Sequence, residues 1–243
     1  MQEITKNQLK DFARLQQKKY RQQFGKVIVE GKRTIELLIE NHIHIDTIFY
    51  SDEADLPDNI ASVTEQIKLQ NWQMEKITAT KNPQNIAALL PTETPKINSR
   101  KFLLYLDNIK EPGNLGTIFR TASAAGLDGI VLSPDCCEIF NPKVIRSSLG
   151  TVFVLPSEVH DLDWLQKQRA QIFVSTLQNA KDLGEVERSN ENCILVLGSE
   201  AEGVRPEIYE MGFENINIPI SSNVESLNVA VAAGIMIFQL KNT

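Results

Sequence analysis

Residues 102–133 read FLLYLDNIKEPGNLGTIFRTASAAGLDGIVLS, and this stretch changes twice between two kinds of hydrophobic pattern. Short apolar runs at its two ends predict buried strands at 102–107 and 129–133. Between them a Pro-Gly turn leads into 115–125, which has the spacing of a helix. Strands joined through a helix indicate a parallel sheet, because a parallel crossover needs a connection of about this length.

The same alternation continues along the chain, so we expect an α/β fold with a C-terminal parallel sheet and a small N-terminal α/β domain. The further expected strands are 27–30, 45–51, 151–155, 172–177, 193–197 and 215–220. The further expected helices are 4–20, 32–40, 83–90, 142–148, 163–169, a short one from Pro206 and a long one from Leu227. Residues 91–100, PTETPKINSR, have the composition of a linker, which predicts domains at 1–96 and 97–243.

The charge of the chain is distributed unevenly. The whole chain has 25 Lys and Arg against 31 Asp and Glu, a net charge of −6. Residues 1–33 alone hold nine bases and three acids, so this arm carries +6 and the remaining 210 residues carry −12. A basic arm on an acidic body is typical of a protein with one end that meets a polyanion such as RNA, although a solvated helix face would have the same composition.

The composition also excludes a membrane protein. No apolar run approaches the roughly 20 residues that a membrane span needs, and the first ten residues are too polar for the core of a signal peptide. We therefore expect a cytoplasmic protein with no membrane partner.

Cysteine and histidine do not form the pattern of a metal site. Adjacent Cys136 and Cys137, with Cys193 far along the chain, lack the spacing of zinc ligands, so we expect unreactive thiols. His42 and His44 stand two residues apart in a polar turn without suitably spaced carboxylates. No metal is expected.

Three loops after predicted strands contain more glycine and polar residues than a simple turn requires. The first reads DNIKEPGNLGTIFRTASAAG over 107–126. Asn114 is expected to cap its helix, and Arg120, in an otherwise apolar helix, is expected to point into a site or a subunit contact. The alternative is that Arg120 only forms a structural ion pair.

The other two loops are LVLGSEAEGV over 195–204 and INIPISSNVESLNVAVAAGIMIF over 216–238. Gly198 permits close backbone approach, and its spacing to Gly203 matches neither the dinucleotide-binding fingerprint nor the P-loop. The helix of the last loop consists almost wholly of small and apolar residues. We expect it to be buried all round, either in a core or in a subunit interface.

In these three loops the chain resembles the SpoU (TrmH) family of RNA 2′-O-ribose methyltransferases, because all three motifs of that family occur in order. Residues 19–38, KYRQQFGKVIVEGKRTIELL, also resemble the start of the family's ribosomal-protein-like substrate-binding domain. The resemblance covers essentially the entire chain and implies a trefoil knot in the C-terminal domain. One departure is Ala230, where many members have serine.

The resemblance implies a set of functional residues. The implied catalytic residues are Arg120, Asn114, Glu200, Ser226 and Asn228. Among them, Glu200 would orient the guanidinium of Arg120. S-adenosylmethionine would lie in the knot, held mainly by main-chain groups around Thr176, Leu197, Gly198, Ile218 and Leu227. A homodimer is also implied, in which the arginine of one subunit reaches the cofactor of the other.

The expected reaction is methyl transfer from S-adenosylmethionine to a ribose 2′-hydroxyl in ribosomal or transfer RNA. Since a guanidinium has a pKa above about 12, we expect Arg120 to bind phosphate and stabilise the developing alkoxide rather than to accept a proton. Two alternatives remain: an RNA-binding or assembly factor without activity, and a methyltransferase that acts on a base nitrogen.

Overall fold

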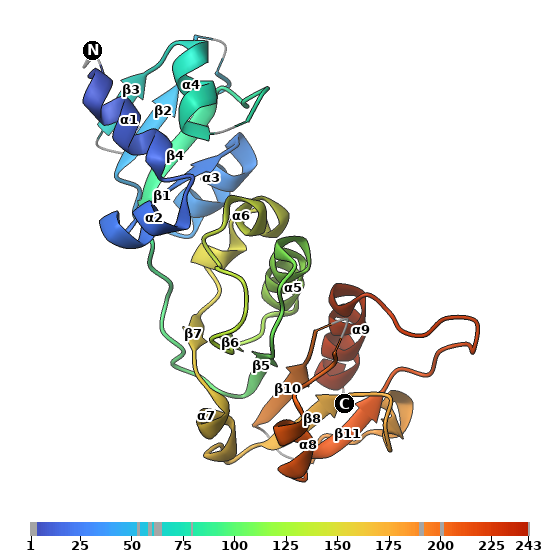
Figure 1. The fold of residues 1–243 in the computed structure, drawn as a ribbon. Helices are drawn as coiled ribbons and strands as arrows, with labels where there is room; N and C mark the ends of the chain where they lie inside the picture. Colours follow the sequence, from blue (N-terminus) through green and yellow to red (C-terminus); the bar gives the residue numbers. More distant parts are fainter. Residues whose placement is uncertain are drawn as a thin grey trace. The chain divides into compact units, whose positions relative to one another are not determined.

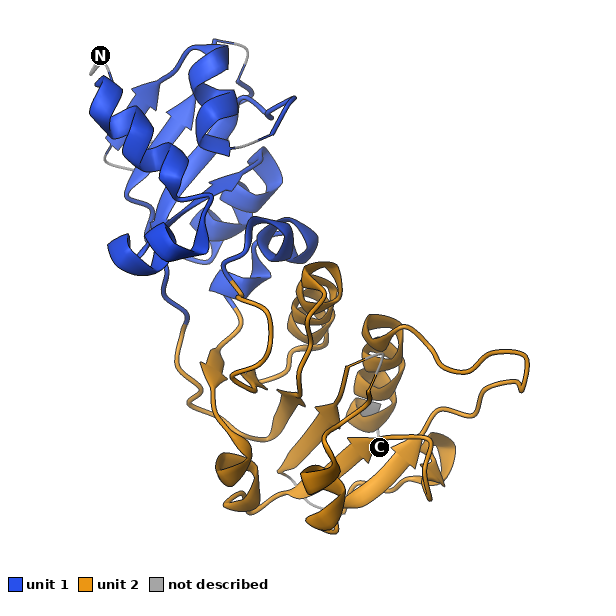
Figure 2. Ribbon diagram, viewed as in Figure 1, with its two compact units in different colours: residues 1–94, 140–154 blue, residues 95–139, 155–243 orange. Residues whose placement is uncertain are grey.

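The computed structural model describes residues 4–52, 54–57, 60, 65–78, 80–189, 192–199 and 202–242 (Figure 1). The chain forms two compact units, residues 1–94 with 140–154 (unit 1) and residues 95–139 with 155–243 (unit 2), which Figure 2 colours separately. Segment 140–154 is part of unit 1, where its helix α6 (Pro142–Ser148) packs against strand β1 (Lys26–Glu30). The functional domains expected at 1–96 and 97–243 stay a prediction.

Unit 1 is built on a four-stranded sheet in the order β1-β4-β2-β3. Its other strands are β2 (Thr47–Tyr50), β3 (Glu65–Lys68) and β4 (Ile86–Pro91). Its other helices are α1 (Lys6–Arg14), α2 (Lys18–Phe24), α3 (Lys32–Glu40), α4 (Asn71–Thr78) and the 3₁₀ turn η2 (Thr151–Phe153). Helices α1 and α4 pack on one face of the sheet, where Leu9, Met74 and Ile77 surround Phe49.

The prediction of a helix over residues 83–90 is wrong, because most of that segment is strand β4. Alanine and leucine favour a helix in isolation, but β4 pairs antiparallel with β1 on one side and with β2 on the other. Residues Ile86 to Leu90 are all buried. Burial in the centre of a sheet overrides the local propensity.

Two more predictions in unit 1 are wrong. Residues 151–155 do not form a strand, since Leu149 (φ 51°) and Gly150 (φ 85°) have left-handed backbone that turns the chain into η2. The single helix expected over 4–20 is instead two helices, α1 and α2, which are separated at residues 15–17.

Unit 2 is built on a seven-stranded sheet in the order β7-β6-β5-β10-β8-β11-β9, and every pairing in it is parallel. The strands are β5 (Phe102–Leu106), β6 (Gly129–Leu132), β7 (Ser157–Val159), β8 (Gln171–Ser175), β9 (Lys181–Asp182), β10 (Cys193–Leu197) and β11 (Glu214–Asn217). The helices are α5 (Pro112–Ala125), α7 (Leu162–Gln166), α8 (Pro206–Glu210), α9 (Val229–Asn242) and the 3₁₀ turn η3 (Leu183–Glu185). The predicted α/β class with a C-terminal parallel sheet is confirmed.

Helices cover both faces of this sheet, as a parallel sheet requires. Alternate residues of a strand point to opposite faces, and Leu103 and Tyr105 of β5 join a core that includes Leu165 of α7 and Ile208 of α8. On the other face, α9 packs against β10 and against α5. The predicted trefoil knot stays a prediction. Among the described residues no helix has the length and apolar character needed to cross a bilayer.

Candidate functional site

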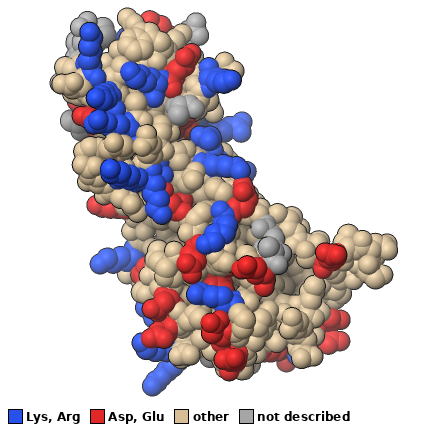
Figure 3. Space-filling view, viewed as in Figure 1, with Lys and Arg blue, Asp and Glu red and all other residues tan. Residues whose placement is uncertain are grey.

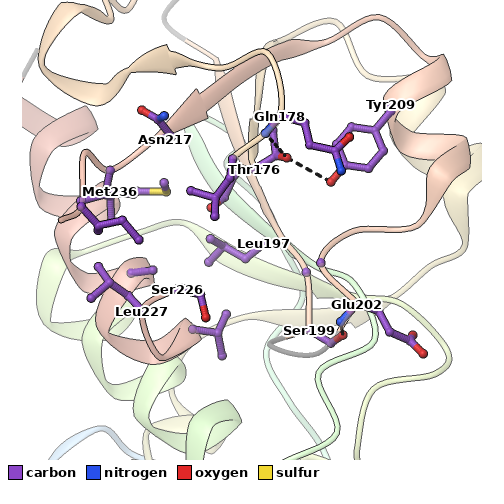
Figure 4. A pocket seen from close by; sticks show the side chains of 18 residues that line it. Thr176, Gln178, Leu197, Ser199, Glu202, Tyr209, Asn217, Ser226, Leu227 and Met236 are labelled. Carbon is purple, nitrogen blue, oxygen red and sulfur yellow. Dashed lines mark hydrogen bonds between the residues drawn. The ribbon is translucent and has the colours of Figure 1, made fainter. Parts of the chain in front are cut away.

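A cavity of about 270 Å³ lies in unit 2 where β8, β10 and β11 end (Figure 4). The carboxyl ends of parallel strands are the usual ligand-binding edge of an open α/β sheet. The lining of the cavity includes all five residues expected to surround a cofactor and one from the expected catalytic set: Thr176, Leu197, Gly198, Ile218, Leu227 and Ser226. Tertiary structure therefore brings the second and third motifs together with the end of β8.

Gly198 occupies a place where no side chain fits. A Cβ there would lie 2.1 Å from the carbonyl carbon of Gly203 and 2.2 Å from the backbone nitrogen of Val204. The two backbone segments are held together by paired hydrogen bonds between Ser199 and Gly203, of 3.0 and 2.9 Å. Gly203 itself has φ +69°, a left-handed conformation that suits glycine. This close contact of main chain leaves backbone at the cavity wall.

The side of the cavity formed by the end of β8 is polar. The Tyr209 hydroxyl donates to Oγ1 of Thr176 at 3.2 Å, and the backbone N–H of Gln178 donates to the same oxygen at 3.1 Å. Asn217 lines the cavity as well, and its Oδ1 is buried with no hydrogen-bond partner among the described residues. An unpaired buried amide oxygen is costly, which suits a place where a ligand completes the hydrogen bonding.

The walls and the rim of the cavity differ in chemistry. Leu197, Ile218 and Met236 provide apolar wall. Glu202 lies at the rim, where its carboxylate points away from the cavity (Figure 4) and accepts a hydrogen bond of 3.3 Å from Nδ2 of Asn108. Apolar walls beside open backbone fit a flat heterocycle. These features fit the adenine ring of S-adenosylmethionine.

An ion pair joins the ends of β5 and β10. Asp107 is fully buried, and Arg205 donates to Oδ1 from Nε at 2.8 Å and to Oδ2 from its backbone N–H at 2.9 Å. Burial opposes the charge of Arg205, but the hydrogen bond and the charge of Asp107 outweigh it and raise the pKa of Arg205. The pair is structurally important because a buried carboxylate without its partner is strongly destabilising. The sequence contains no signal for it, because 98 residues separate the two side chains.

The first and third motifs meet through two asparagines. Nδ2 of Asn228 donates to Oδ1 of Asn114 at 3.0 Å, and Oδ1 of Asn228 accepts from the backbone N–H of Ala230 at 3.0 Å, inside the first turn of α9. The expectation that Asn114 caps its helix is wrong. Asn114 lies within α5, whose N-cap is Glu111, and the asparagine that bonds a helix terminus is Asn228.

Arg120 lies on the exposed face of α5 and is not part of the cavity lining. The structure of a single chain therefore does not bring it to the predicted cofactor position. Glu200, the other charged member of the expected catalytic set, lies outside the described residues.

Helix α9 is buried on only one face. Ala233, Met236, Ile237 and Leu240 are buried, while Val231, Ile235 and Phe238 are 52%, 43% and 47% exposed. The exposed three are spaced by four and three residues and so lie on one side of the helix. The expectation of burial all round is not met within one chain, which leaves the alternative of a subunit interface.

The cysteines have no sign of activation. Burial raises the pKa of Cys137 to about 11 and that of Cys193 to about 12, so both thiols are protonated near neutral pH, as predicted for unreactive side chains. Within the described part of the chain, no three His, Cys, Asp or Glu side chains are grouped as metal ligands. The expectation of no metal stays a prediction.

Known proteins are similar to this chain over nearly its full length. The model of the SpoU rRNA Methylase family matches residues 101–238, and that of the MRM3-like substrate binding domain matches residues 6–88. The 23S rRNA (guanosine(2553)-2′-O)-methyltransferase RlmP of Bacillus subtilis is 33% identical, covering 98% of each chain.

Two solved structures have the same fold. The AdoMet-bound rRNA methyltransferase from Sinorhizobium meliloti is 25% identical, with a TM-score of 0.87 over 98% of this chain and 96% of that one. An RNA methyltransferase of the TrmH family from Porphyromonas gingivalis, whose assignment is putative, is 26% identical, with a TM-score of 0.85 over 100% of both chains.

The close backbone contact at Gly198 makes a direct test of the cavity wall possible. We expect Gly198→Ala to lower the free energy of unfolding by about 1–3 kcal/mol, because the new methyl group must displace the Gly203 backbone. Urea denaturation measures this loss. Gly184→Ala is the matched control, since a Cβ at Gly184 has nothing within 4 Å. Equal stability of the two variants would contradict the close contact.

Proposed function

Because this chain belongs to the SpoU rRNA methylase family, we propose that it transfers a methyl group from S-adenosylmethionine to a ribose 2′-hydroxyl of ribosomal RNA. The observation that supports this most directly is the cavity at the ends of β8, β10 and β11, which the second and third motifs line. We propose a cytoplasmic location as well, because the similar RlmP of Bacillus subtilis is a 23S rRNA methyltransferase and bacterial ribosomes lie in the cytoplasm.

We propose that the cavity holds the cofactor, with adenine against Leu197, Ile218 and Leu227 and the sulfonium toward the rim. The cofactor, when bound, supplies a methyl group that is already activated on sulfur. The chain then has to position the ribose oxygen in line with that methyl group and keep water out. Backbone groups beside Gly198 would recognise the adenine edge at short range, since no side chain stands between them and the cavity.

Arg120 would stabilise negative charge on the attacking oxygen. Its guanidinium remains protonated and presents paired donors, a geometry that suits a phosphate and a neighbouring alkoxide. Since Arg120 is exposed on α5 and outside the cavity lining, we propose that it serves the cavity of a second subunit. Within one chain, the hydrogen bond between Asn114 and Asn228 ties the start of α5, which carries Arg120, to the start of α9.

We propose that the second subunit binds on the exposed face of α9. Val231, Ile235 and Phe238 form an apolar stripe there, and clustered apolar side chains on a surface are typical of protein contacts. Ser226 and Leu227 of the cavity immediately precede this helix, so a dimer formed along it lies next to the cofactor position.

The acceptor atom can be tested with a deoxy substrate. Ribosomal RNA from cells without this gene, incubated with the protein and labelled S-adenosylmethionine, should gain a 2′-O-methyl group at one mapped nucleotide. The same RNA with a single 2′-deoxy nucleotide there should still bind but accept no label. Methylation of the deoxy RNA would identify a base nitrogen as acceptor, and tight RNA binding without any transfer would favour the assembly-factor alternative.

Arg120→Lys tests the role of the guanidinium. We expect transfer to fall by about a hundredfold or more while dimerisation and cofactor affinity remain, since lysine keeps the charge but loses the planar pair of donors. Single-turnover kinetics measures transfer, calorimetry measures cofactor affinity, and sedimentation measures dimerisation. Near-normal transfer by the variant would remove Arg120 from the mechanism.

Ile235→Asp tests the proposed subunit contact. A buried charge without a partner opposes association, so we expect the variant to sediment as a monomer and to lose transfer. Val159→Asp is the matched control, because Val159 is also apolar, 61% exposed and outside α9. A dimeric Ile235→Asp variant would place the interface elsewhere.

A further inference from the structure

Helix α2 presents an aromatic pair on the surface of unit 1. Tyr20 and Phe24 are four residues apart, and their rings stack with centroids 6.2 Å apart and planes 14° from parallel. Phe24 is 43% exposed. An exposed phenylalanine leaves apolar ring surface open to solvent, where a flat ligand can cover it.

Two cations lie close to the Tyr20 ring of this pair. The Arg14 guanidinium carbon is 5.3 Å from the centre of the Tyr20 ring, and Nζ of Lys19 is 5.8 Å from it. Arg14 is oriented by a hydrogen bond of 2.9 Å to Asp11. The aromatic pair is thus bordered by positive charge at cation–π distance.

The surrounding surface is basic as well. Figure 3 shows Lys and Arg side chains gathered over the surface that α1 and α2 form. The exposed bases of these two helices are Lys6, Lys10, Lys18 and Lys19. Phosphates therefore have cationic partners on α2, which carries the aromatic pair, and on α1.

The pair stands on a rigid support. Arg21 is only 2% exposed, and its Nη1 donates to the carbonyl oxygens of Leu15 and Gln16, both at 2.8 Å. These bonds fix α2 to the end of α1. Gly25 then ends α2 in a left-handed conformation. A platform that is ordered beforehand loses little entropy when a ligand binds.

We propose that Tyr20 and Phe24, with Arg14 and Lys19, form a stacking platform for an unpaired base of the substrate RNA. This inference rests on the proposed function, because it takes RNA as the substrate. Sequence-specific RNA recognition uses unpaired bases that stack on aromatic rings or guanidinium planes, and the surface combines both. The flanking lysines contact the adjoining phosphates, and the platform selects single-stranded or looped RNA over a continuous duplex.

The test measures binding of the full-length protein to a labelled RNA single strand of about 12 nucleotides without self-pairing. A second probe has the same phosphates and riboses but no bases. Phe24→Ala and Phe24→Leu should each weaken binding to the first probe by about 5- to 150-fold, because leucine keeps apolar volume but not the flat ring. On the abasic probe, wild type and both variants should bind equally.

Salt dependence separates stacking from charge. Phe24→Ala should leave the slope of log affinity against log salt unchanged. Lys18→Ala should make this negative slope shallower by about 0.7. Trp72→Ala is the matched control, since Trp72 is an exposed aromatic residue (54%) on α4 of the same unit. The RNA affinity of this variant should equal that of the wild type. Equal unfolding midpoints show that the variants are folded.

The proposal is wrong if the Phe24 variants bind the single strand as tightly as the wild type does. It is also wrong if the variants lose the same affinity for the abasic probe as for the single strand. Either result can be distinguished from failure of the proposed function. If the variants bind normally while the wild type forms 2′-O-methylribose, the platform is wrong and the function stands.

Discussion

The pairing of β10 with β5 on one side and β8 on the other is the constraint on which the site depends. These parallel ladders place the end of β10 in the middle of the carboxyl edge of a seven-stranded sheet. The segment after β10 must then turn within a space bounded by its neighbours. Gly198 makes this possible, because backbone of residues 203 and 204 occupies the place of its missing side chain.

Charge at this edge is arranged to hold loops together rather than to react. Asp107, directly after β5, is fully buried and forms an ion pair with Arg205. Nη1 of Arg205 also lies 3.6 Å from Oδ2 of Asp135 in the loop after β6. One guanidinium thus connects loops that follow three strands. Asp107 is fully buried whereas the Arg205 side chain is 31% exposed, so desolvation of the carboxylate offsets part of the attraction between the two charges.

Positive charge is concentrated in the first 33 residues, which form part of unit 1. The first 33 residues carry +6 and the rest −12, so attraction of a polyanion is concentrated on the unit that carries α1 and α2. The cavity of unit 2 needs little positive charge, because main chain and apolar side chains line most of it. An acidic protein can therefore bind RNA, since the distribution of charge matters more than its sum.

Sequence alone determined the regular strands of the C-terminal sheet and identified the two loops, 195–204 and 216–238, that contribute to the lining of the cavity. The apolar strands β5, β6, β8 and β10 were predictable because burial on both faces requires continuous hydrophobic runs, and the three motif loops could be found by their glycines and asparagines. Prediction from sequence failed at β4, where Ala and Leu favour a helix. It also failed at Asn114, which lies inside α5 and does not cap it, whereas Asn228 bonds the start of α9. Only the tertiary structure decided these points, together with the Asp107–Arg205 pair and the aromatic pair on α2. The reason is physical: burial patterns repeat locally along a chain, whereas pairing across a sheet and contacts over 98 residues depend on which segments the fold places side by side.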